Sequence, residues 1–490
     1  MKPVFENPSA LENNVKSSFS FPSFIMMENA ASALSECIKS AWNTGKYDSI
    51  IFLCGKGNNG ADGLACARML FLNLPVFIYC PELPETEEGA VQAEMCRKLK
   101  IPFISKQKLL QKTVFKNIFV DCIYGTGFHG KLPEETIKIF QKINSSESFR
   151  IACDISSGLA FNAHETLTMG SLKAALFSDK AKAVSGKIKT AELGISCKLF
   201  ESASKTDIFL LEESDVNLPF RNKADTHKGS FGHAAVFSGT KSGASILSAE
   251  ASINFGSGLT SLIRTDVSNL SQLKINPEIM IADEIPKNVK SIQIGSGLGN
   301  PENPEIQKII HSLETWFTST KNPACVIDAD MFTWKELPAF LKKLNKIPDV
   351  RIVLTPHAKE LANLFNTLRL TEKNLSKEIP FELNAESALE HRLTLGRVFT
   401  KIFPQIILVM KGANTFIASK GKIFIFAGGS PALSKGGSGD VLAGMINSLL
   451  AQGYNAQNAA ITSVYRHGSA AEKIGKKNYN LTAQKLISLI

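Results

Sequence analysis

The stretch Lys435–Leu450, KGGSGDVLAGMINSLL, joins a glycine-rich loop to an apolar segment. The apolar residues recur at helical spacing, which predicts a helix with an apolar stripe against a core. They are Val441, Leu442, Met445, Ile446, Leu449 and Leu450. Glycine permits backbone conformations that a Cβ forbids, so the loop can turn successive N–H groups toward an anion. The positive end of the following helix favours the same anion. The three loop glycines are Gly436, Gly437 and Gly439.

Asp440 stands in this loop where phosphate oxygens would gather. A carboxylate is poorly suited to holding a phosphate in the ground state. It is well suited to a general base that takes a proton from a hydroxyl attacking a phosphoryl group. The alternative is a glycine-rich turn in which Asp440 is merely an acid of the first helical turn. We favour the catalytic interpretation for this stretch.

The composition is that of a globular protein with two or three domains, since 490 residues exceed one usual core. Hydrophobic residues make up 44% and charged residues 20%, and the net charge of +10 is spread along the chain. Aromatic residues do not interleave with a basic cluster, so we expect small acidic ligands and no nucleic acid. Nine cysteines without a CxxC pair indicate reduced thiols in a cytoplasmic protein. No signal pattern or membrane-length apolar run occurs, so we expect no membrane association.

In the first half, the apolar segment SIIFLC runs directly into GKGNNGADGL. Gly55, Gly57 and Gly60 match the dinucleotide-binding spacing, which is a weak signal by itself. More informative are the side chains that offer amide and carboxylate oxygens for a ribosyl hydroxyl, an amide or a monovalent cation. These are Asn58, Asn59 and Asp62. The alternative is that they only form turns and cap a helix.

Two further apolar segments end in carboxylates. Asp121 ends the first, and Asp154 ends the second. Because an open parallel α/β sheet collects the carboxyl ends of its strands along one crevice, we expect both to lie near Asn59 in a shared site. The second half repeats this pattern with Asp328, His357 and other polar residues after apolar strands. His357 in isolation would be read as a core or capping histidine. No P-loop sequence is present.

The first half resembles the NAD(P)H-hydrate epimerase family over about residues 20–215, through MEN, GNNGADGL, VDCIYGTGF and DISSGL in that order. The resemblance implies a Rossmann-like three-layer αβα domain over residues 1–215, with Asp154 as the acid–base group at C6 of the nicotinamide ring. It implies a potassium ion held by Asn59, Asp121 and Ser157. The residues implied to hold the hydrated dinucleotide are Asn58, Asn59, Gly60, Ala61, Asp62, Gly125, Thr126, Gly127, Phe128, His129, Gly130 and Lys131. Ala61 and Ser156 stand where the family usually has Gly and Pro.

The second half, residues 223–490, resembles the ribokinase-like ADP/ATP-dependent NAD(P)H-hydrate dehydratase family through HKG, GSGLG, DAD, TPHAKE, KGANT and KGGSGD. The resemblance implies a ribokinase-like α/β domain in which Asp440 deprotonates the C6 hydroxyl of the hydrate, while Gly297 and His357 contact it. ADP or ATP with Mg²⁺ is implied to bind at Lys411, Gly412, Ala413, Asn414, Thr415 and Gly439. Asp328 and Glu360 are candidate Mg²⁺ ligands, and Ser296 replaces a usual Pro.

Together the two resemblances imply a bifunctional repair enzyme that interconverts the R and S forms of NADHX or NADPHX and dehydrates the S form. They also imply assembly into a homo-oligomer. The alternative is a ribokinase-like small-alcohol kinase of the vitamin type fused to a non-catalytic Rossmann-like module that binds RNA or protein. Asp154 argues against that alternative, because a pure binding surface does not need a carboxylate in this pocket.

Overall fold

The computed structural model describes residues 1–128, 130–271, 273–372 and 374–490, and for Lys476 the backbone alone. Within the described ranges, no helix combines the length and apolar character that crossing a membrane requires. All nine cysteines are free thiols, and most of them are buried.

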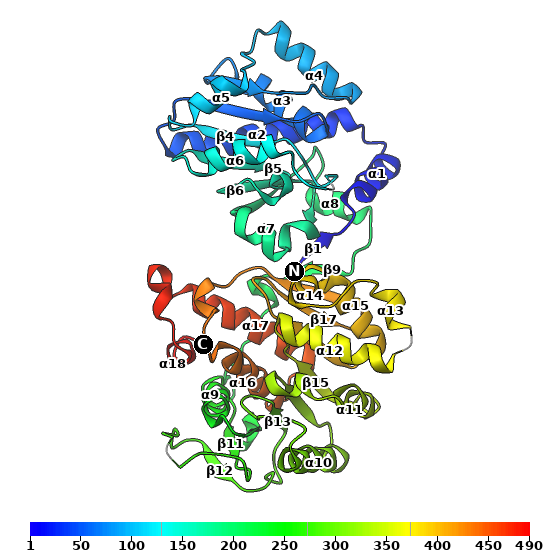
Figure 1. The fold of residues 1–490 in the computed structure, drawn as a ribbon, viewed down its shortest axis with the longest axis vertical. Helices are drawn as coiled ribbons and strands as arrows, with labels where there is room; N and C mark the ends of the chain where they lie inside the picture. Colours follow the sequence, from blue (N-terminus) through cyan, green and yellow to red (C-terminus); the bar gives the residue numbers. More distant parts are fainter. Residues whose placement is uncertain (129, 272, 373) are drawn as a thin grey trace. The chain divides into compact units, whose positions relative to one another are not determined.

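The chain divides into two compact units (Figure 1). The N-terminal unit is Pro3–Ile208, and the C-terminal unit is Met1–Lys2 with Phe209–Ile490. The sequence predicts the change of domain within Leu199–Arg221, with the domains at residues 1–215 and 223–490. In the structure the segment after Ile208 joins the sheet of the C-terminal unit, where the Leu211 N–H donates to the Ile425 carbonyl at 2.9 Å. Two strands straddle the division: β1 (Lys2–Phe5) and β9 (Ile208–Leu210).

The N-terminal unit is built on a parallel sheet with the strand order β3-β2-β4-β5-β6-β8. Its strands are β2 (Ile50–Cys54), β3 (Val76–Tyr79), β4 (Ile118–Cys122), β5 (Phe149–Cys153), β6 (Glu165–Met169) and β8 (Lys187–Ala191). A short strand, β7 (Leu172–Lys173), pairs in parallel with Val4 and Phe5 of β1.

Helices cover both faces of this sheet, because successive strand residues point to opposite sides. Ile50 and Phe52 pack into one core with α2 and α3, whereas Ile51 and Leu53 pack into another with α5 and α6. The helices are α1 (Pro8–Phe19), α2 (Ser23–Thr44), α3 (Asn58–Leu70), α4 (Glu87–Lys98), α5 (Lys106–Lys112), α6 (Glu134–Asn144), α7 (Asp179–Val184) and α8 (Cys197–Ser202), with 3₁₀ turns η1 (Ser157–Leu159) and η2 (Ala174–Phe177). The predicted Rossmann-like three-layer arrangement is confirmed.

The C-terminal unit carries a sheet in the order β12-β11-β10-β13-β14-β15-β16-β17-β18, parallel up to β16 and antiparallel beyond it. The predicted return after the strand at 406–410 is therefore a true hairpin. The strands are β10 (His233–Phe237), β11 (Leu259–Ile263), β12 (Met280–Ala282), β13 (Ser291–Ile294), β14 (Ala324–Ile327), β15 (Arg351–Leu354), β16 (Ile406–Met410), β17 (Thr415–Ser419) and β18 (Lys422–Phe426).

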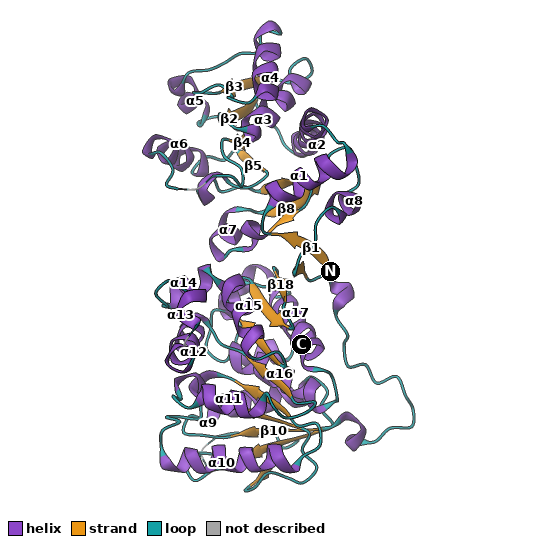
Figure 2. Cartoon of the chain, turned by 90° about the vertical axis from the view of Figure 1, so that its right-hand side faces the viewer, coloured by secondary structure: helices purple, strands orange, loops and turns teal. Residues whose placement is uncertain are grey.

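Figure 2 shows helices on either side of this second sheet. Val409 and Ile417 face a core shared with α16 and α17, while the neighbouring Met410 and Ala418 approach Gly396 of α15 on the other face. The helices are α9 (Ser242–Asn254), α10 (Pro304–Ser319), α11 (Leu337–Leu344), α12 (Ala358–Thr371), α13 (Leu375–Glu378), α14 (Ala385–Glu390), α15 (Arg392–Ile402), α16 (Ser438–Ala451), α17 (Ala456–Glu472) and α18 (Ala483–Ile487). The 3₁₀ turns are η3 (Glu213–Asp215), η4 (Lys228–Phe231), η5 (Ala329–Thr333), η6 (Pro431–Leu433) and η7 (Gly475–Asn480).

Helix α16 is the predicted helix of the glycine-rich stretch, but it is more deeply buried than a one-sided stripe implies. Every residue from Val441 to Ala451 is buried. The polar residues among them are satisfied by hydrogen bonds: the Ser291 hydroxyl donates to Asn447 Oδ1 at 2.6 Å, and Asn447 Nδ2 donates to the Ala235 carbonyl at 3.0 Å. The reason is that α16 packs on the sheet and also against α9 and α17.

Gly444 allows the close approach of α16 to α9. A Cβ on Gly444 would lie 2.2 Å from the backbone oxygen of Ser248, which cannot rotate away. We therefore predict that Gly444→Ala destabilises the C-terminal unit by about 1–3 kcal/mol through overpacking. Gly243→Ala in α9 is the matched control, since a Cβ there meets no atom within 4 Å. Denaturant titration followed by circular dichroism should show a lower midpoint for Gly444→Ala and an unchanged or higher one for Gly243→Ala.

Candidate functional site

In the N-terminal unit, Asp121 and Ser157 form a buried pair at the ends of two neighbouring strands. The Ser157 hydroxyl donates to Asp121 Oδ1 at 2.6 Å, and its backbone N–H donates to Oδ2 at 2.8 Å. The Ile123 N–H adds a third bond to Oδ1 at 3.2 Å. Burial raises the pKa of Asp121 to about 6 in spite of these donors. Because these donors do not offset the cost of burying the carboxylate, a positive charge beside it would stabilise its ionised form.

Asn59 lies in the first turn of α3 and is buried. Neither its amide oxygen nor its amide nitrogen has a hydrogen-bond partner among the described residues. A Cβ on Gly125 would lie 3.6 Å from Asn59 Cβ and 3.4 Å from Asp154 Oδ2. Asn59 and Asp154 therefore flank the same turn, as predicted. Because buried amides are nearly always bonded, the free Asn59 amide marks a place for a ligand or ion.

Asp154 follows β5 in a left-handed conformation, with φ of 69°. One carboxylate oxygen, Oδ1, is held by the Met169 N–H at 3.1 Å, by the Thr168 hydroxyl at 3.3 Å and by an ion pair with Lys173. The other oxygen, Oδ2, faces Gly125. Oδ2 is therefore directed at the candidate site, while the bonds to Oδ1 fix the side chain of Asp154. A backbone held at positive φ in a non-glycine residue often marks a functional position.

Lys173 is a site residue that the sequence analysis missed. Its side chain is 2% exposed, and burial lowers its pKa to about 8. The available signal was a lone lysine inside the otherwise apolar segment Leu172–Phe177. A lysine in such a segment is either at the surface or paired with a buried acid. Nothing local indicates which acid, because Asp154 lies on a different strand.

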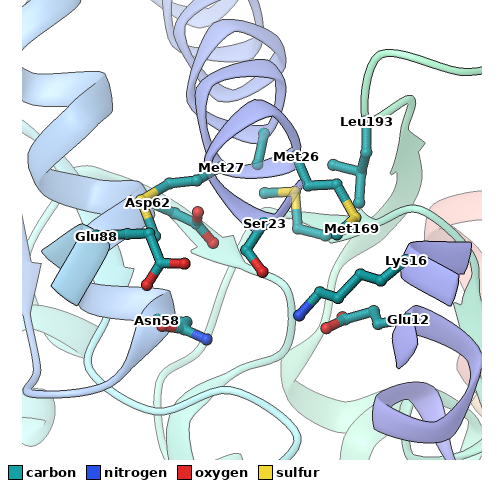
Figure 3. Close-up of a pocket in the computed structure, with 11 residues that line it drawn as sticks. Glu12, Lys16, Ser23, Met26, Met27, Asn58, Asp62, Glu88, Met169 and Leu193 are labelled. Atoms are coloured by element: carbon teal, nitrogen blue, oxygen red, sulfur yellow. The ribbon is translucent and has the colours of Figure 1, made fainter. Parts of the chain in front are cut away.

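A pocket of about 90 Å³ lies between α1, α2, α3 and α4 (Figure 3). Asn58 and Asp62, both predicted to hold the substrate, line it. Glu12 and Lys16 of α1 lie across the pocket from them. Burial, followed by the Glu12 carboxylate, raises the pKa of Asp62 well above its ordinary value. The other lining residues are Ser23, Met26, Met27, Ala30, Glu88, Met169 and Leu193.

The two residues that depart from the family pattern, Ala61 and Ser156, are held by local contacts. A Cβ on Gly89 of α4 would lie 3.3 Å from the Ala61 methyl, so that methyl points toward α4. Ser156 has φ of −58°, which is the value that a proline ring would impose. Its hydroxyl donates to the Phe161 carbonyl at 2.7 Å and accepts from the Phe161 N–H at 3.2 Å. These two hydrogen bonds hold the turn at Ser156, where the ring of a proline would restrict φ.

The remaining predicted residues of this unit are less directly placed. Gly60 serves a close approach, since a Cβ there would lie 1.8 Å from the Gly55 carbonyl oxygen. The turn after β4 closes through a bond from the Phe128 N–H to the Gly125 carbonyl at 3.2 Å, with Thr126 and Gly127 between them. Gly130 and Lys131 are exposed. His129 lies outside the described residues.

In the C-terminal unit, Asp440 occupies the first turn of α16. Of the three loop glycines, Gly437 alone adopts positive φ, at 92°, and precedes the helix. Burial, followed by the charge of Asp328, raises the pKa of Asp440 to about 6. A group with this pKa ionises near neutral pH and is suited to accept a proton.

The Lys411 ammonium group lies between the glycine loop before α16 and Asp328, the residue that follows β14. A Cβ on Gly439 would lie 3.4 Å from Lys411 Nζ. The same Nζ donates to Asp328 Oδ1 at 3.1 Å, and the Thr355 hydroxyl donates to that oxygen at 2.7 Å. Burial lowers the pKa of Lys411. The charges of Asp328 and Glu360 raise it by more, so the net shift of the pKa is upward. The ammonium group therefore stays charged beside Gly439 and Asp440.

His357 is the N-cap of α12, which is the local role expected of it in isolation. Its Nδ1 accepts from the N–H groups of Lys359 at 3.2 Å and Glu360 at 3.3 Å, so Nε2 carries the proton. Glu360 in turn accepts from the His357 N–H at 2.8 Å, and burial raises the pKa of Glu360 to about 7. The imidazole is about half exposed, and its Nε2 lies 3.2 Å from Glu360 Oε1.

The other predicted residues lie in turns at the same edge of the sheet. Gly297 has φ of 64°, and its carbonyl accepts from the Lys241 N–H at 2.9 Å. Gly412 and Ala413 are exposed in the turn of the β16–β17 hairpin. The turn is completed by Asn414, which is buried, and by Thr415, which begins β17. Exposed small residues at a turn leave room for a bulky ligand.

Neither candidate Mg²⁺ ligand is free of protein partners. Asp328 is bonded to Lys411 and Thr355, and Glu360 is bonded to the His357 backbone. Within the described part of the chain, no group of three or more His, Cys, Asp or Glu side chains is arranged to hold a metal ion. We therefore assign no protein ligand to Mg²⁺.

Comparison with known proteins gives two family matches. The family described as NAD(P)H-hydrate dehydratase matches residues 234–490, and the one described as YjeF-related protein N-terminus matches residues 23–176. The bifunctional NAD(P)H-hydrate repair enzyme Nnr of Helicobacter pylori is 35% identical over 500 residues, spanning 100% of this chain and 99% of its own. Its namesake in Dictyoglomus turgidum is 27% identical over 531 residues, spanning 99% and 96%. An ADP/ATP-dependent NAD(P)H-hydrate dehydratase structure from Bacillus subtilis, co-crystallised with ATP and Mg²⁺, aligns at 22% identity with a TM-score of 0.45, covering 55% of this chain and 91% of that one.

The Asp154–Lys173 pair generates a prediction about stability. Lys173→Met leaves a mostly buried carboxylate without its counter-charge, so we expect a loss of about 3 kcal/mol in the free energy of unfolding. Adding Asp154→Asn to Lys173→Met removes the unpaired charge and should recover much of that loss. Urea titration of the single and double variants measures the coupling. Additive effects of the two substitutions would contradict the pairing.

Proposed function

The chain belongs to the family of bifunctional NAD(P)H-hydrate repair enzymes, and we propose that Asp154 and Asp440 carry its two reactions. It is a nicotinamide-nucleotide repair enzyme that interconverts the R and S forms of hydrated NADH or NADPH and dehydrates the S form at the expense of ADP or ATP. One observation carries the proposal. Each unit places an aspartate, buried in the case of Asp154 and partly buried in the case of Asp440, at the edge where parallel strands end, beside a glycine turn that a ligand can approach.

For epimerisation, Asp154 acts at C6 of the nicotinamide ring as the acid–base group. Its Oδ2 gives and takes the proton, while Oδ1 remains bound to Lys173, Met169 and Thr168. The positive charge of Lys173 favours the ionised carboxylate. The substrate lies against the pocket that contains Asn58 and Asp62.

For dehydration, Asp440 takes the proton of the C6 hydroxyl while that oxygen attacks the terminal phosphoryl group, whose bond to the bridging oxygen breaks and releases AMP from ADP or ADP from ATP. The Gly439 N–H and Lys411 stabilise negative charge on the transferred group. Phosphate then leaves from C6, and loss of a ring proton restores the C=C bond. Hydroxide is a very poor leaving group, so phosphorylation makes the elimination feasible. Mg²⁺ neutralises charge on the nucleotide phosphates when it is bound with them.

The two roles predict that Asp154→Asn and Asp440→Asn each abolish a different one of the two reactions. With an epimer mixture of NADHX and ADP or ATP, Asp154→Asn should stop recovery of NADH near half, because the R form is no longer converted. Asp440→Asn should reduce nucleotide-dependent recovery by about 10³-fold or more while epimerisation continues. NADH absorbance follows dehydration, and chromatography of the two epimers follows their interconversion. Full recovery by Asp154→Asn would refute the first role, and unchanged dehydration by Asp440→Asn the second.

We propose that potassium binds at Asn59, Asp121 and Ser157. The residues fit such an ion, because among the described residues the Asn59 amide oxygen is buried and unpartnered and the Asp121 carboxylate forms no ion pair. Potassium favours oxygen ligands of this kind and would compensate the buried charge. The ion, when bound, supplies positive charge at the edge of the epimerase site.

This cation site predicts a salt-specific stabilisation. The raised pKa of Asp121 means that its ionisation, between pH 4 and about 6, removes stability from the cation-free protein as pH rises. KCl, compared with choline chloride at equal ionic strength, should therefore stabilise the N-terminal unit by about 1–3 kcal/mol above pH 6 and less at pH 5. Thermal unfolding measures the difference.

Asn59→Leu is the sharpest variant for this test, because the Asn59 amide makes no hydrogen bond in the described structure. It should leave stability in choline chloride nearly unchanged and abolish the response to KCl. A KCl response that survives in Asn59→Leu would show that the ion binds elsewhere.

We further propose that the enzyme works in the cytoplasm and as a homo-oligomer on soluble NADHX and NADPHX. The free, mostly buried thiols are consistent with a reducing compartment. The alternative of a vitamin-type kinase joined to a binding module is set aside by the family membership, which extends over both halves of the chain.

A further inference from the structure

A buried histidine of α17 contacts the glycine loop at the start of α16. His467 is 7% exposed, and its Nε2 lies 2.9 Å from the Ser438 backbone oxygen. Burial lowers the pKa of His467 to about 4, so the imidazole is neutral near neutral pH. The two residues are 29 positions apart in the sequence, and the contact depends on the packing of α17 against α16. The mechanism proposed above gives His467 no part.

The partner of Nε2 decides where the imidazole carries its proton. A neutral imidazole has one N–H group, and a carbonyl oxygen can only accept a hydrogen bond. Nε2 of His467 therefore donates to the Ser438 oxygen, and Nδ1 carries no proton.

The Ser438 carbonyl belongs to the same peptide group as the Gly439 N–H. In a trans peptide the C=O and the N–H lie in one plane and point in opposite directions. The Gly439 N–H therefore points away from His467, and any rotation of this peptide group would turn the N–H with it. A hydrogen bond received by the carbonyl also polarises the peptide group, which makes its N–H a stronger donor.

The start of α16 leaves the Gly439 N–H available to a ligand. The N-cap is Gly437, which has no side chain to bond the first turn. The Ser438 N–H donates to the Lys435 oxygen at 3.3 Å, and the Val441 N–H donates to the Gly437 oxygen at 3.1 Å. In the part of the chain that the structure describes, the Gly439 N–H between them donates to no backbone acceptor. Such an unbonded N–H at the start of a helix can take an anion.

Ser438 is held from two sides. Its hydroxyl donates to the Leu433 oxygen of η6 at 2.7 Å, while its carbonyl accepts from His467. Gly468, the next residue of α17, permits close packing, since a Cβ there would lie 2.1 Å from Cε1 of Phe426 in β18. The helix that carries His467 is thus packed directly on the sheet.

We propose that His467 is a positioning residue of the dehydratase, which holds the Ser438–Gly439 peptide group so that the Gly439 N–H faces the phosphoryl group in transfer. This inference rests on the proposed role of the glycine loop in phosphoryl transfer. His467 acts through the peptide group and exchanges no proton with the substrate. Because negative charge on the transferred group develops in the transition state, a misdirected N–H lowers kcat more than it weakens substrate binding.

A purely structural role for His467 gives a different expectation. His467 lies among buried residues of α17 such as Val464 and Ala471. If its bond to Ser438 only anchored α17, loss of the bond would lower the stability of the C-terminal unit and leave the turnover of the folded enzyme unchanged. The kcat of folded variants therefore separates the two roles.

The test compares variants of the full-length enzyme with the S epimer of NADHX and with ADP or ATP. His467→Leu removes the donor, so we expect kcat to fall about 10- to 100-fold while the KM values of both substrates stay within about twofold of the parent. His467→Gln keeps an N–H donor and should restore kcat to within about threefold of the parent. Rates are measured at a temperature where circular dichroism shows each variant to be folded.

Val464→Ala is the matched control, because Val464 is buried on α17 about one turn before His467. It should lower stability by opening a cavity and leave kcat unchanged. Unchanged kcat in His467→Leu, an equal loss in Val464→Ala, or His467→Gln as slow as His467→Leu overturns the proposal.

Nuclear magnetic resonance of the parent enzyme tests the proton direction without relying on the folding of His467→Leu. With ¹⁵N-labelled histidine, the signal that is lost in His467→Gln should be that of a neutral imidazole with its proton on Nε2. A proton on Nδ1 would overturn the proposal.

Asp440→Asn separates this inference from the proposed function. If Asp440→Asn dehydrates NADHX at the parent's rate, phosphoryl transfer does not occur at the glycine loop and both fail. If Asp440→Asn removes dehydration while His467→Leu keeps the parent's kcat, this inference alone fails.

Discussion

The burial of aspartate carboxylates at the carboxyl ends of parallel strands is the constraint on which both sites depend. A charge removed from water is costly unless donors or a counter-charge surround it. Asp121 receives three hydrogen bonds, Asp154 an ion pair and two hydrogen bonds, and Asp328 a lysine and a threonine. The donors to Asp121 come from the turns that follow β4 and β5, whereas those to Asp154 come from strands β6 and β7. Because the sheet edge gathers the strand ends, the carboxylates lie close to the glycine turns that admit a ligand.

The two units meet this constraint differently, and the difference follows from the chemistry proposed for each. Asp154 forms a direct ion pair with the buried Lys173. The lysine beside Asp440, Lys411, is instead hydrogen-bonded to Asp328. Burial, followed by the charge of Asp328, raises the pKa of Asp440 to about 6. The charge of Asp154 is therefore compensated by a direct ion pair, whereas Asp440 shares the charge of Lys411 with Asp328.

Departures from a family pattern are explained by local bonding in this chain. Ser156 adopts the φ of a proline and secures it with two hydrogen bonds to Phe161. Ala61 directs its methyl toward α4 and not toward the pocket. Ser296 brings a hydroxyl where a proline would have none, and the structure surrounds it with polar partners.

Apolar periodicity and glycine turns were sufficient to predict parallel strands that end in polar residues such as Asn59, Asp121 and Asp154, and the glycine loop that carries Asp440, because these are properties of neighbouring residues. The Rossmann-like and ribokinase-like folds and the place of Ser157 in the site were implied by the family resemblance. Tertiary structure alone decided that Lys173 pairs with Asp154, that Glu12 and Lys16 line the pocket, and that Ser248 and Gln293 bond around Asp440. It also decided that α16 is buried on all sides. These contacts join strands and helices that are distant in the sequence, so their partners depend on how the elements pack and not on the spacing of residues along the chain.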